Sequence, residues 1–345
     1  MNSDMNRHFW VIAVAILAGC GKPDVSEPRV DPVEGVSMAL SLSLPYIGEE
    51  AADWWEGTTP AGGECMSCHH IPMALWVQSE AARAQIEHSW PRFDGLAPLE
   101  AFFDPLPGND EGSVNGGPFR GAMVLLGRKA TVEGGLAESD WQALAERVIS
   151  TQAGDGSWPR HVNLANQVRK SGIETDAITA NWIALALSSV TQPSTATVSA
   201  RDLALTWLDG ASAGESLEWW VSRLIVESEL GGAGNAPVPL QQIVIELQQD
   251  DGGWGWVQGQ ESDPFSTGLA LYGLLRTGLG ADHGAIHHGV QFLLDRQRED
   301  GSWETPSVLS SQTPNDKKDY LYEFWGTTWA TLGLLRYSIA TSEQP

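Results

Sequence analysis

Basic residues, cysteines and long apolar runs are scarce in this sequence, and each shortage narrows the possible functions. The chain has 20 Lys and Arg against 44 Asp and Glu, a formal net charge of −24, which makes nucleic acid an unsuitable partner. Its three cysteines are few for 345 residues, and the motifs described below account for all of them. The one clear apolar run, at residues 9–18, is too short to span a membrane.

Tryptophan is the exception, with 16 copies against 8 Phe and 5 Tyr. This excess indicates a structure that uses indole rings at repeated positions. The aliphatic and aromatic share of 42% is ordinary for a globular protein, and it excludes disorder as the main state. The length allows one large domain or two of average size.

The first 19 residues have the layout of a secretory signal, because Arg7 precedes the apolar run at residues 9–18. The run ends in the tetrapeptide LAGC at residues 17–20, which resembles a bacterial lipobox. The resemblance implies that Cys20 is acylated and anchors the mature chain to a membrane of the bacterial cell envelope, facing the periplasm. An uncleaved anchor or a wrongly chosen start codon is the alternative.

After the signal, prolines alternate with acidic residues, which is typical of a solvated tether. We therefore expect three parts: a lipoprotein signal peptide at residues 1–19, a tether at 20–36 and one folded body at 37–345.

Residues 65–69 read Cys-Met-Ser-Cys-His, the spacing C-x-x-C-H. Two thiols at this spacing add to the two vinyl groups of haem while the adjacent His reaches the iron. Cys65 and Cys68 are thus predicted thioether anchors of haem c, and His69 is the predicted iron ligand. The motif resembles the attachment site of c-type cytochromes, whose haem is attached outside the cytoplasm, where the lipobox also places the chain.

Other roles for the two cysteines stay open. A disulfide between Cys65 and Cys68 suits an oxidising compartment, although it gives no role to His69. A zinc ion bound by both thiolates and one or two later histidines is a second alternative. A redox-active dithiol is a third. We favour haem because the export signal supports it independently.

A second pattern, Q-x-x-D-G-x-W, recurs at residues 152–158, 248–254 and 297–303. Apolar residues at helical spacing precede and follow each copy, so the repeating unit is helix, turn, helix. Gly after Asp suits a tight turn at a helix end, with the carboxylate available to nearby backbone N–H groups. The first interval between the tryptophans is about twice the second, which predicts a degenerate unit near Trp207.

These segments resemble the QW repeats of squalene-hopene and oxidosqualene cyclases, which are related to protein prenyltransferase β subunits. The resemblance extends from about Trp141 to Tyr337. It implies an all-α fold, an α/α toroid of about six helical hairpins in which an inner ring of helices surrounds a central cavity. It also implies that the Gln and Trp side chains are structural and link the ends of outer helices.

The catalytic motifs of these two enzyme groups have no counterpart in the sequence. It contains no D-x-D-D, the motif that supplies the acid of squalene-hopene cyclases. It has no cysteine beyond Cys68 for the zinc site of a prenyltransferase. The sequence therefore leaves open whether the chain is an enzyme.

Acidic residues near the starts of the inner helices are the remaining catalytic candidates. Asp176, Asp263 and Glu323 each stand six positions before an expected core residue, and His70 stands in the same frame. The four core residues are Trp182, Leu269, Trp329 and Trp76. We expect the haem at the mouth of the toroid, close to the three carboxylates and to Tyr320 or Tyr322. N-capping is the alternative role for Asp176 and Asp263.

Three functions follow from these patterns. The first is electron transfer or another redox function of haem c, with a redox partner protein and a hydrophobic, isoprenoid-like small molecule in the cavity as a further option. The second is a terpene-cyclase-like enzyme, in which a cavity acid such as Asp263 is kept protonated by burial or by a neighbouring acid. The third is a non-catalytic binding or haem-sensor module.

Overall fold

The computed structural model describes residues 31–59, 70–89, 117–127, 138–158, 172–231, 238–305 and 316–343. Within these ranges the regular secondary structure is α-helical, and the only β pairing consists of isolated bridges from Ser216 to Val257 and from Gly255 to Ser262. The predicted all-α class is confirmed. The predicted lipid and haem sites, at Cys20, Cys65, Cys68 and His69, lie outside the described residues.

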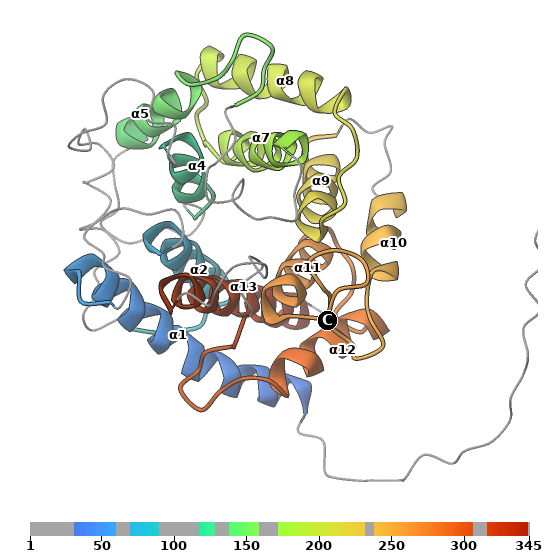
Figure 1. Cartoon of the computed structure of the whole chain (residues 1–345). Coiled ribbons are helices and arrows are strands. Elements are labelled where there is room, and N and C mark those ends of the chain that lie inside the picture. The colour runs from blue at the N-terminus through green and yellow to red at the C-terminus, as the bar shows by residue number, and fades with distance from the viewer. Residues whose placement is uncertain are drawn as a thin grey trace, which may run out of the picture. The chain divides into compact units, whose positions relative to one another are not determined.

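Six of the described helices form a closed inner ring (Figure 1). Each packs against the next along the chain, and the last packs against the first. An inner helix is covered on every side, so it is apolar all round rather than on one face. In α11, for example, every residue from Pro264 to Leu275 is buried. The ring consists of α2 (Ile71–Arg83), α4 (Gly117–Gly127), α7 (Gly172–Ser188), α9 (Leu217–Leu230), α11 (Pro264–Arg276) and α13 (Asp316–Ser342).

Five further described helices lie outside this ring (Figure 1). They bury one face and expose the other: α1 buries Leu40 and Leu44, whereas Met38 and Leu42 are exposed. The outer helices thus surround the inner ring, and the predicted α/α toroid is confirmed. The outer helices are α1 (Pro32–Glu56) against α2 and α13, α5 (Glu138–Ile149) against α4, α8 (Thr195–Asp209) against α7, α10 (Val238–Glu246) against α9 and α12 (Gly284–Leu294) against α11.

The glutamines of the three QW motifs link neighbouring outer helices. Each side-chain amide donates to the glycine carbonyl four residues later in its own turn and to a carbonyl of another outer helix. The second acceptors are Ala200 of α8, Ala285 of α12 and Ala39 of α1, at 2.8, 2.9 and 2.9 Å. The bond from Gln297 to Ala39 ties the turn that follows α12 to α1, so it joins the two ends of the folded chain.

The tryptophans of the motifs attach each turn to the helix before it. Trp158, Trp254 and Trp303 donate from Nε1 to carbonyls ten residues earlier in α5, α10 and α12, at 2.9, 2.7 and 2.8 Å. All three indole rings are at most 1% exposed. The predicted structural role of the Gln and Trp residues is therefore confirmed.

The Asp-Gly pairs shape the turns themselves. Each Asp accepts a hydrogen bond from the backbone N–H two residues later, as the sequence predicts. The glycine that follows has a positive φ, for example +91° at Gly301. A Cβ at Gly301 would lie 2.4 Å from the carbonyl oxygen of Leu42 in α1. Only glycine therefore allows the turn to approach the next outer helix.

The pair α8 and α9 fills the interval between the first two complete motifs. α8 ends at Asp209, just after Trp207, and α9 begins at Leu217 with Ser216 as its N-cap. The side chain of Ser216 accepts a hydrogen bond from the backbone N–H of Trp219. The predicted degenerate unit is confirmed as a helical hairpin that keeps the architecture without the Q-x-x-D-G-x-W turn.

Three helices begin earlier than the sequence pattern predicts. α1 begins at Pro32, so the tether expected at residues 20–36 ends before that residue. α7 and α13 begin ahead of Asp176 and Glu323, so both acids lie inside helices rather than at their starts. The first turn of α13 is the polar run Asp-Lys-Lys-Asp, which apolar periodicity cannot reveal.

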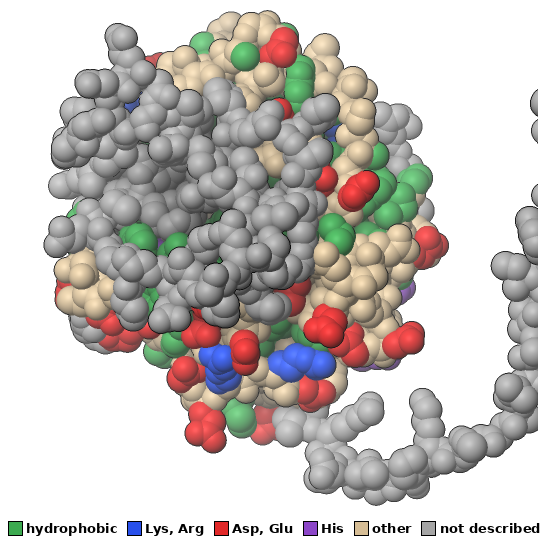
Figure 2. All heavy atoms as spheres, in the orientation of Figure 1, with side chains coloured by type: hydrophobic (Ala, Val, Ile, Leu, Met, Phe, Trp, Pro, Cys, Tyr) green, Lys and Arg blue, Asp and Glu red, His purple; other side chains and the backbone are tan. Residues whose placement is uncertain are grey.

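The surface reflects the acidic composition. In Figure 2 acidic side chains are spread over the visible described surface, whereas basic ones gather along its lower edge. No helix within the described ranges combines the length and the apolar character that a membrane crossing requires.

Candidate functional site

His70, the residue directly after the predicted haem motif, is held in an aromatic stack. Its ring lies 4.0 Å from Trp54 and 4.1 Å from Phe324, centroid to centroid, with interplanar angles of 9° and 16°. Tyr320 stacks at 5.6 Å, and His70 is completely buried. These four residues, the His70 clamp, join the end of α1 and the first half of α13 to the N-terminus of α2.

A group of acids and tyrosines adjoins the clamp. Tyr320 donates from its hydroxyl to Glu50 Oε2 of α1 at 2.5 Å. Tyr46, also of α1, donates to Glu323 Oε1 at 3.5 Å, and Arg298 pairs with Glu323 Oε2 at 2.6 Å. We call Tyr46, Glu50, Arg298, Tyr320 and Glu323 the Glu50 cluster. Tyr320 belongs to both groups, so it couples the acids to the aromatic stack.

The electrostatics of the cluster differ between its two carboxylates. Burial raises the pKa of Glu50, the hydrogen bond from Tyr320 opposes this, and the charges of Asp53 and Glu323 raise the pKa further. Burial and the neighbouring carboxylates also raise the pKa of Tyr46 and Tyr320, so both hydroxyls remain protonated donors. Glu323 instead faces a guanidinium. Glu50 is thus the member best suited to carry a proton.

The three acids predicted from the sequence have different environments. Asp263 is the N-cap of α11: it accepts from Ser266 N at 2.8 Å and from Ser266 Oγ at 2.9 Å, so the capping alternative holds there. Asp176 lies inside α7 rather than at its start, and N-capping is wrong for this residue. Glu323 belongs to the Glu50 cluster, next to Tyr320 as the sequence analysis expects.

Sequence reasoning missed other buried acids on the inner ring, two of them near the starts of α7 and α9. Glu174 of α7 accepts from the backbone N–H of Ser216 at 2.8 Å, and Glu218 of α9 accepts from Trp182 Nε1 at 3.2 Å. They are 5% and 4% exposed. Glu218 also stands six positions before a buried residue, Leu224. The six-residue frame therefore contained the signal, but no complete motif precedes α9 to draw attention to it.

Below these acids, four large rings from four inner helices meet at the centre. Trp76 lies 5.8 Å from Trp182, 5.5 Å from Tyr272 and 5.4 Å from Trp329. The contact between Trp182 and Trp329, at 5.8 Å, completes the group. We call these four residues the aromatic floor. They include three of the four predicted core residues, which confirms the six-position frame, and Leu269 is also fully buried.

The six-position offset places Trp182 and Trp329 about 9 Å along their helix axes from Asp176 and Glu323, at 1.5 Å per residue. Glu218 contacts the floor directly, through the indole N–H of Trp182. A group of ion pairs lies on the other side of the floor. Arg276 donates to the Tyr272 hydroxyl at 2.6 Å and pairs with Glu229 at 2.5 Å. Arg336 pairs with Glu80 at 2.7 Å and stacks over the Tyr272 ring at 5.1 Å. The floor therefore separates a layer of acids from a layer of ion pairs.

Among the described residues, no group of three or more His, Cys, Asp and Glu side chains is arranged to hold a metal ion. The zinc alternative involves Cys65 and Cys68, which this observation does not cover.

Comparisons with known proteins bear on the repeat region and on the fold. No family model matches the chain. A dammaradiene synthase from Dryopteris crassirhizoma is 37% identical over an alignment of 102 residues, and the match covers 25% of this chain and 15% of that protein. A drimenyl diphosphate synthase from Streptomyces showdoensis is 34% identical over 58 residues, 17% of this chain and 11% of that protein. The chain thus covers less than a fifth of either relative.

One solved structure resembles the whole toroid. It is the crystal structure of a possible member of the GH105 family from Klebsiella pneumoniae, with a TM-score of 0.52 and 14% identity. The match covers 94% of this chain and 99% of that chain. At this identity the likeness concerns the fold alone. The chain therefore has an α/α toroid fold together with a partial sequence similarity to terpene cyclases.

Proposed function

We propose that this chain is a terpene-cyclase-like enzyme that protonates a linear isoprenoid to begin its cyclisation. The observation that carries the proposal is the aromatic floor inside a ring of helices that also bear buried acids. The sequence similarity to two terpene cyclases supports the same class of substrate, although it covers a small part of each.

The aromatic floor has the chemistry that a carbocation requires. The faces of Trp and Tyr rings carry negative electrostatic potential and attract cations, with an effect of about 2 kcal/mol or more where water is excluded. Trp76, Trp182 and Trp329 are at most 5% exposed, and dry surroundings protect a cation from premature capture by water. The same rings provide an apolar surface for an isoprenoid chain.

Glu50 replaces Asp263 as the proposed proton donor. Both oxygens of Asp263 accept hydrogen bonds from Ser266, so this carboxyl group is already engaged in capping α11. Burial of Glu50 favours its neutral form. In the proposed step, Glu50 transfers its proton to one carbon of an isoprenoid double bond. A C–H bond forms, the other carbon becomes cationic, and Tyr320 donates to the resulting carboxylate. Loss of a proton from the cyclised cation to a base, or addition of water, ends the reaction.

The test is turnover of two linear isoprenoids, squalene and farnesyl diphosphate, by the full chain, with products identified by mass spectrometry. The substitution Glu50→Gln keeps the shape and removes the acid, so it should lower the rate by about 100-fold or more. The control Glu34→Gln changes an exposed acid in the first turn of the same helix and should leave the rate unchanged. If Asp263→Asn abolishes turnover while Glu50→Gln does not, the assignment of the acid is wrong. Absence of any cyclised product contradicts the enzyme itself.

A c-type haem protein with a redox function is the second candidate. The observation that favours it is the His70 clamp. His70 directly follows the predicted haem motif at residues 65–69, and its ring is held against α1 and α13. Haem bound there would supply one-electron chemistry, and the chain would then serve a redox partner protein. Haem staining of denatured protein, produced with cytochrome c maturation machinery, tests this. Staining that vanishes in the Cys65→Ser, Cys68→Ser variant supports haem c, whereas no staining in the wild type removes it.

Lipid attachment at Cys20 is part of either proposal. Metabolic labelling with palmitate in a bacterial host should mark the wild type and spare Cys20→Ala. Labelling that persists in the variant would contradict Cys20 as the attachment site.

A further inference from the structure

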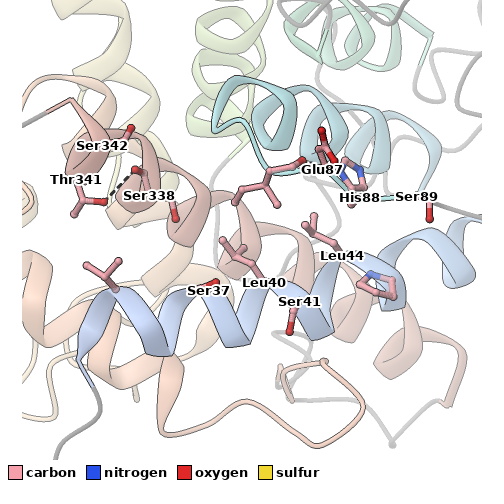
Figure 3. Close-up of a pocket in the computed structure, with 13 residues that line it drawn as sticks. Ser37, Leu40, Ser41, Leu44, Glu87, His88, Ser89, Ser338, Thr341 and Ser342 are labelled. Atoms are coloured by element: carbon pink, nitrogen blue, oxygen red, sulfur yellow. Dashed lines mark hydrogen bonds between the residues drawn. The ribbon is translucent and has the colours of Figure 1, made fainter.

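A groove at the end of α13 opposite the Glu50 cluster has a chemistry of its own. It lies between the first half of α1, the end of α13 and residues 86–89 (Figure 3). Its volume is about 670 Å³, within the range of about 300–1,000 Å³ typical of small-molecule sites. Thr341 in the groove is about 30 Å along α13 from Tyr320, at 1.5 Å per residue. No residue of the Glu50 cluster lines the groove, whose other end, at Pro45 of α1, directly precedes Tyr46 in the sequence.

The base of the groove is apolar. Leu40 and Leu44 of α1 point toward the segment that carries Glu87 and His88 (Figure 3). Pro45 and Ile86 add further apolar lining. Leu40 and Leu44 belong to the core, at 1% and 2% exposure, so the base is a rigid part of the fold. An apolar chain is the ligand part that fits such a surface.

Hydroxyl groups form the polar part of the lining. They come from Ser37 and Ser41 of α1 and from Ser338, Thr341 and Ser342 of α13. Ser41, Thr341 and Ser342 donate their hydrogens to carbonyls three or four residues earlier in their own helices, at 2.7, 3.0 and 2.8 Å. A hydroxyl has one hydrogen, so these oxygens face a ligand as acceptors. At these three positions the ligand supplies the donor. The other lining hydroxyls, on Ser37, Ser89 and Ser338, can donate or accept.

The charges around the groove disfavour an anion. Among the described residues that line it, none is Lys or Arg, and Glu87 adds a carboxylate. Burial lowers the pKa of His88, against the opposing effect of its bond to the Ile86 carbonyl, so the imidazole is uncharged at neutral pH. The C-terminal end of α13 adds partial negative charge from its carbonyls. A carboxylate or phosphate would find no counter-charge.

We propose that this groove binds an uncharged long-chain alcohol. The apolar chain lies against the exposed parts of Val33, Pro45 and Ile86, above Leu40 and Leu44. The alcohol donates its hydrogen to the hydroxyl oxygens of α13 or α1. This site is independent of the proposed enzyme activity, because none of its residues belongs to the Glu50 cluster or the aromatic floor.

The test is isothermal titration calorimetry of the full chain with dodecanol and with dodecanoate, which share one chain length and differ in charge. Dodecanol should bind saturably, and dodecanoate should bind about tenfold more weakly or not at all. Ser41→Trp places a large side chain in the groove from an exposed position and should weaken dodecanol binding about tenfold or more. Met38→Trp is the matched control, because Met38 is exposed on the same helix and does not line the groove.

Equal or tighter binding of dodecanoate would overturn the proposal, as would a failure of the folded wild type to bind dodecanol. Equal weakening by Met38→Trp would show that the ligand lies on another part of α1. Binding should persist in Glu50→Gln, so the failure of this proposal and the failure of the enzyme proposal remain distinguishable.

Discussion

The QW turns and the N-terminal ends of the inner helices show opposite uses of a repeated fold. At the turns, the same Gln, Asp, Gly and Trp make the same hydrogen bonds three times. At the inner-helix ends, the polar group varies between units: a histidine at α2 (His70), glutamates on α7 and α9 (Glu174 and Glu218) and an aspartate at α11 (Asp263). Residues that repeat maintain the architecture, and residues that vary are free to carry chemistry.

The largest effect should come from a repeated tryptophan. Trp254→Ala removes a completely buried indole and its bond to the Val244 carbonyl. We expect a loss of about 3–5 kcal/mol in the free energy of unfolding, measured by chemical denaturation. Trp207→Ala, at a half-buried position in the degenerate unit, is the matched control and should lose much less. Equal losses at the two positions would show that the motif tryptophans have no special role.

The buried pair of Arg336 and Glu80 tests whether residues outside the QW motifs also stabilise the fold. Arg336→Met leaves Glu80, 3% exposed, without its 2.7 Å partner. Arg83, at 3.9 Å, compensates little, so we expect a loss of about 3 kcal/mol in the free energy of unfolding. The double variant with Glu80→Gln should recover part of this loss. A stability unchanged in Arg336→Met would mean that the pair contributes nothing beneath the aromatic floor.

A repeated glutamine should have an intermediate effect. Gln297→Ala removes the bonds to the Gly301 and Ala39 carbonyls, including the one that ties the last QW turn to α1. The expected loss is about 2 kcal/mol in the free energy of unfolding. Gln242→Ala, which removes an exposed bond to Glu246 within α10, is the control and should cost about 0.5 kcal/mol or less. If the two losses coincide, the link between α12 and α1 is not stabilising.

The smallest stability effect should come from the proposed acid. Burial raises the pKa of Glu50 above its ordinary value of 4.5, so the native state keeps this proton more readily than the unfolded state. The protonated Glu50 therefore contributes fully to the free energy of unfolding below pH 4.5, and this contribution is lost as the pH rises through the raised pKa. The melting temperature of Glu50→Gln, measured relative to that of the wild type, should therefore rise as the pH increases from 4 to 7. A difference that stays constant or falls over this range would contradict a partly buried Glu50 that holds its proton.

The sequence predicts most of the fold because the fold is repeated. Gln297 and Trp303 occur in a pattern with two other copies, so their structural role is visible without coordinates. The six-position frame also predicts that Trp76, Trp182 and Trp329 are core residues. The structure adds that their rings meet, since inner helices in one register bring equivalent residues to one level.

The candidate site is harder to predict because its residues lie far apart in the chain. Glu50 precedes the recognised repeats, and its partner Tyr320 is 270 positions away. Only closure of the ring by α1 and α13 brings them together. Asp263, in contrast, stands out in the sequence because it comes just before a helix. N-capping explains this position, and both of its oxygens accept hydrogen bonds from Ser266.

The most direct test of the enzyme proposal is turnover of squalene in D₂O. The Glu50 carboxyl exchanges its proton with solvent, so initiation by Glu50 should place one solvent deuterium on carbon in each cyclised product, raising its mass by about one unit. We predict this label in the wild type and loss of the product in Glu50→Gln. Cyclised product that carries no deuterium, or that forms equally well in Glu50→Gln, would contradict protonation by the Glu50 cluster.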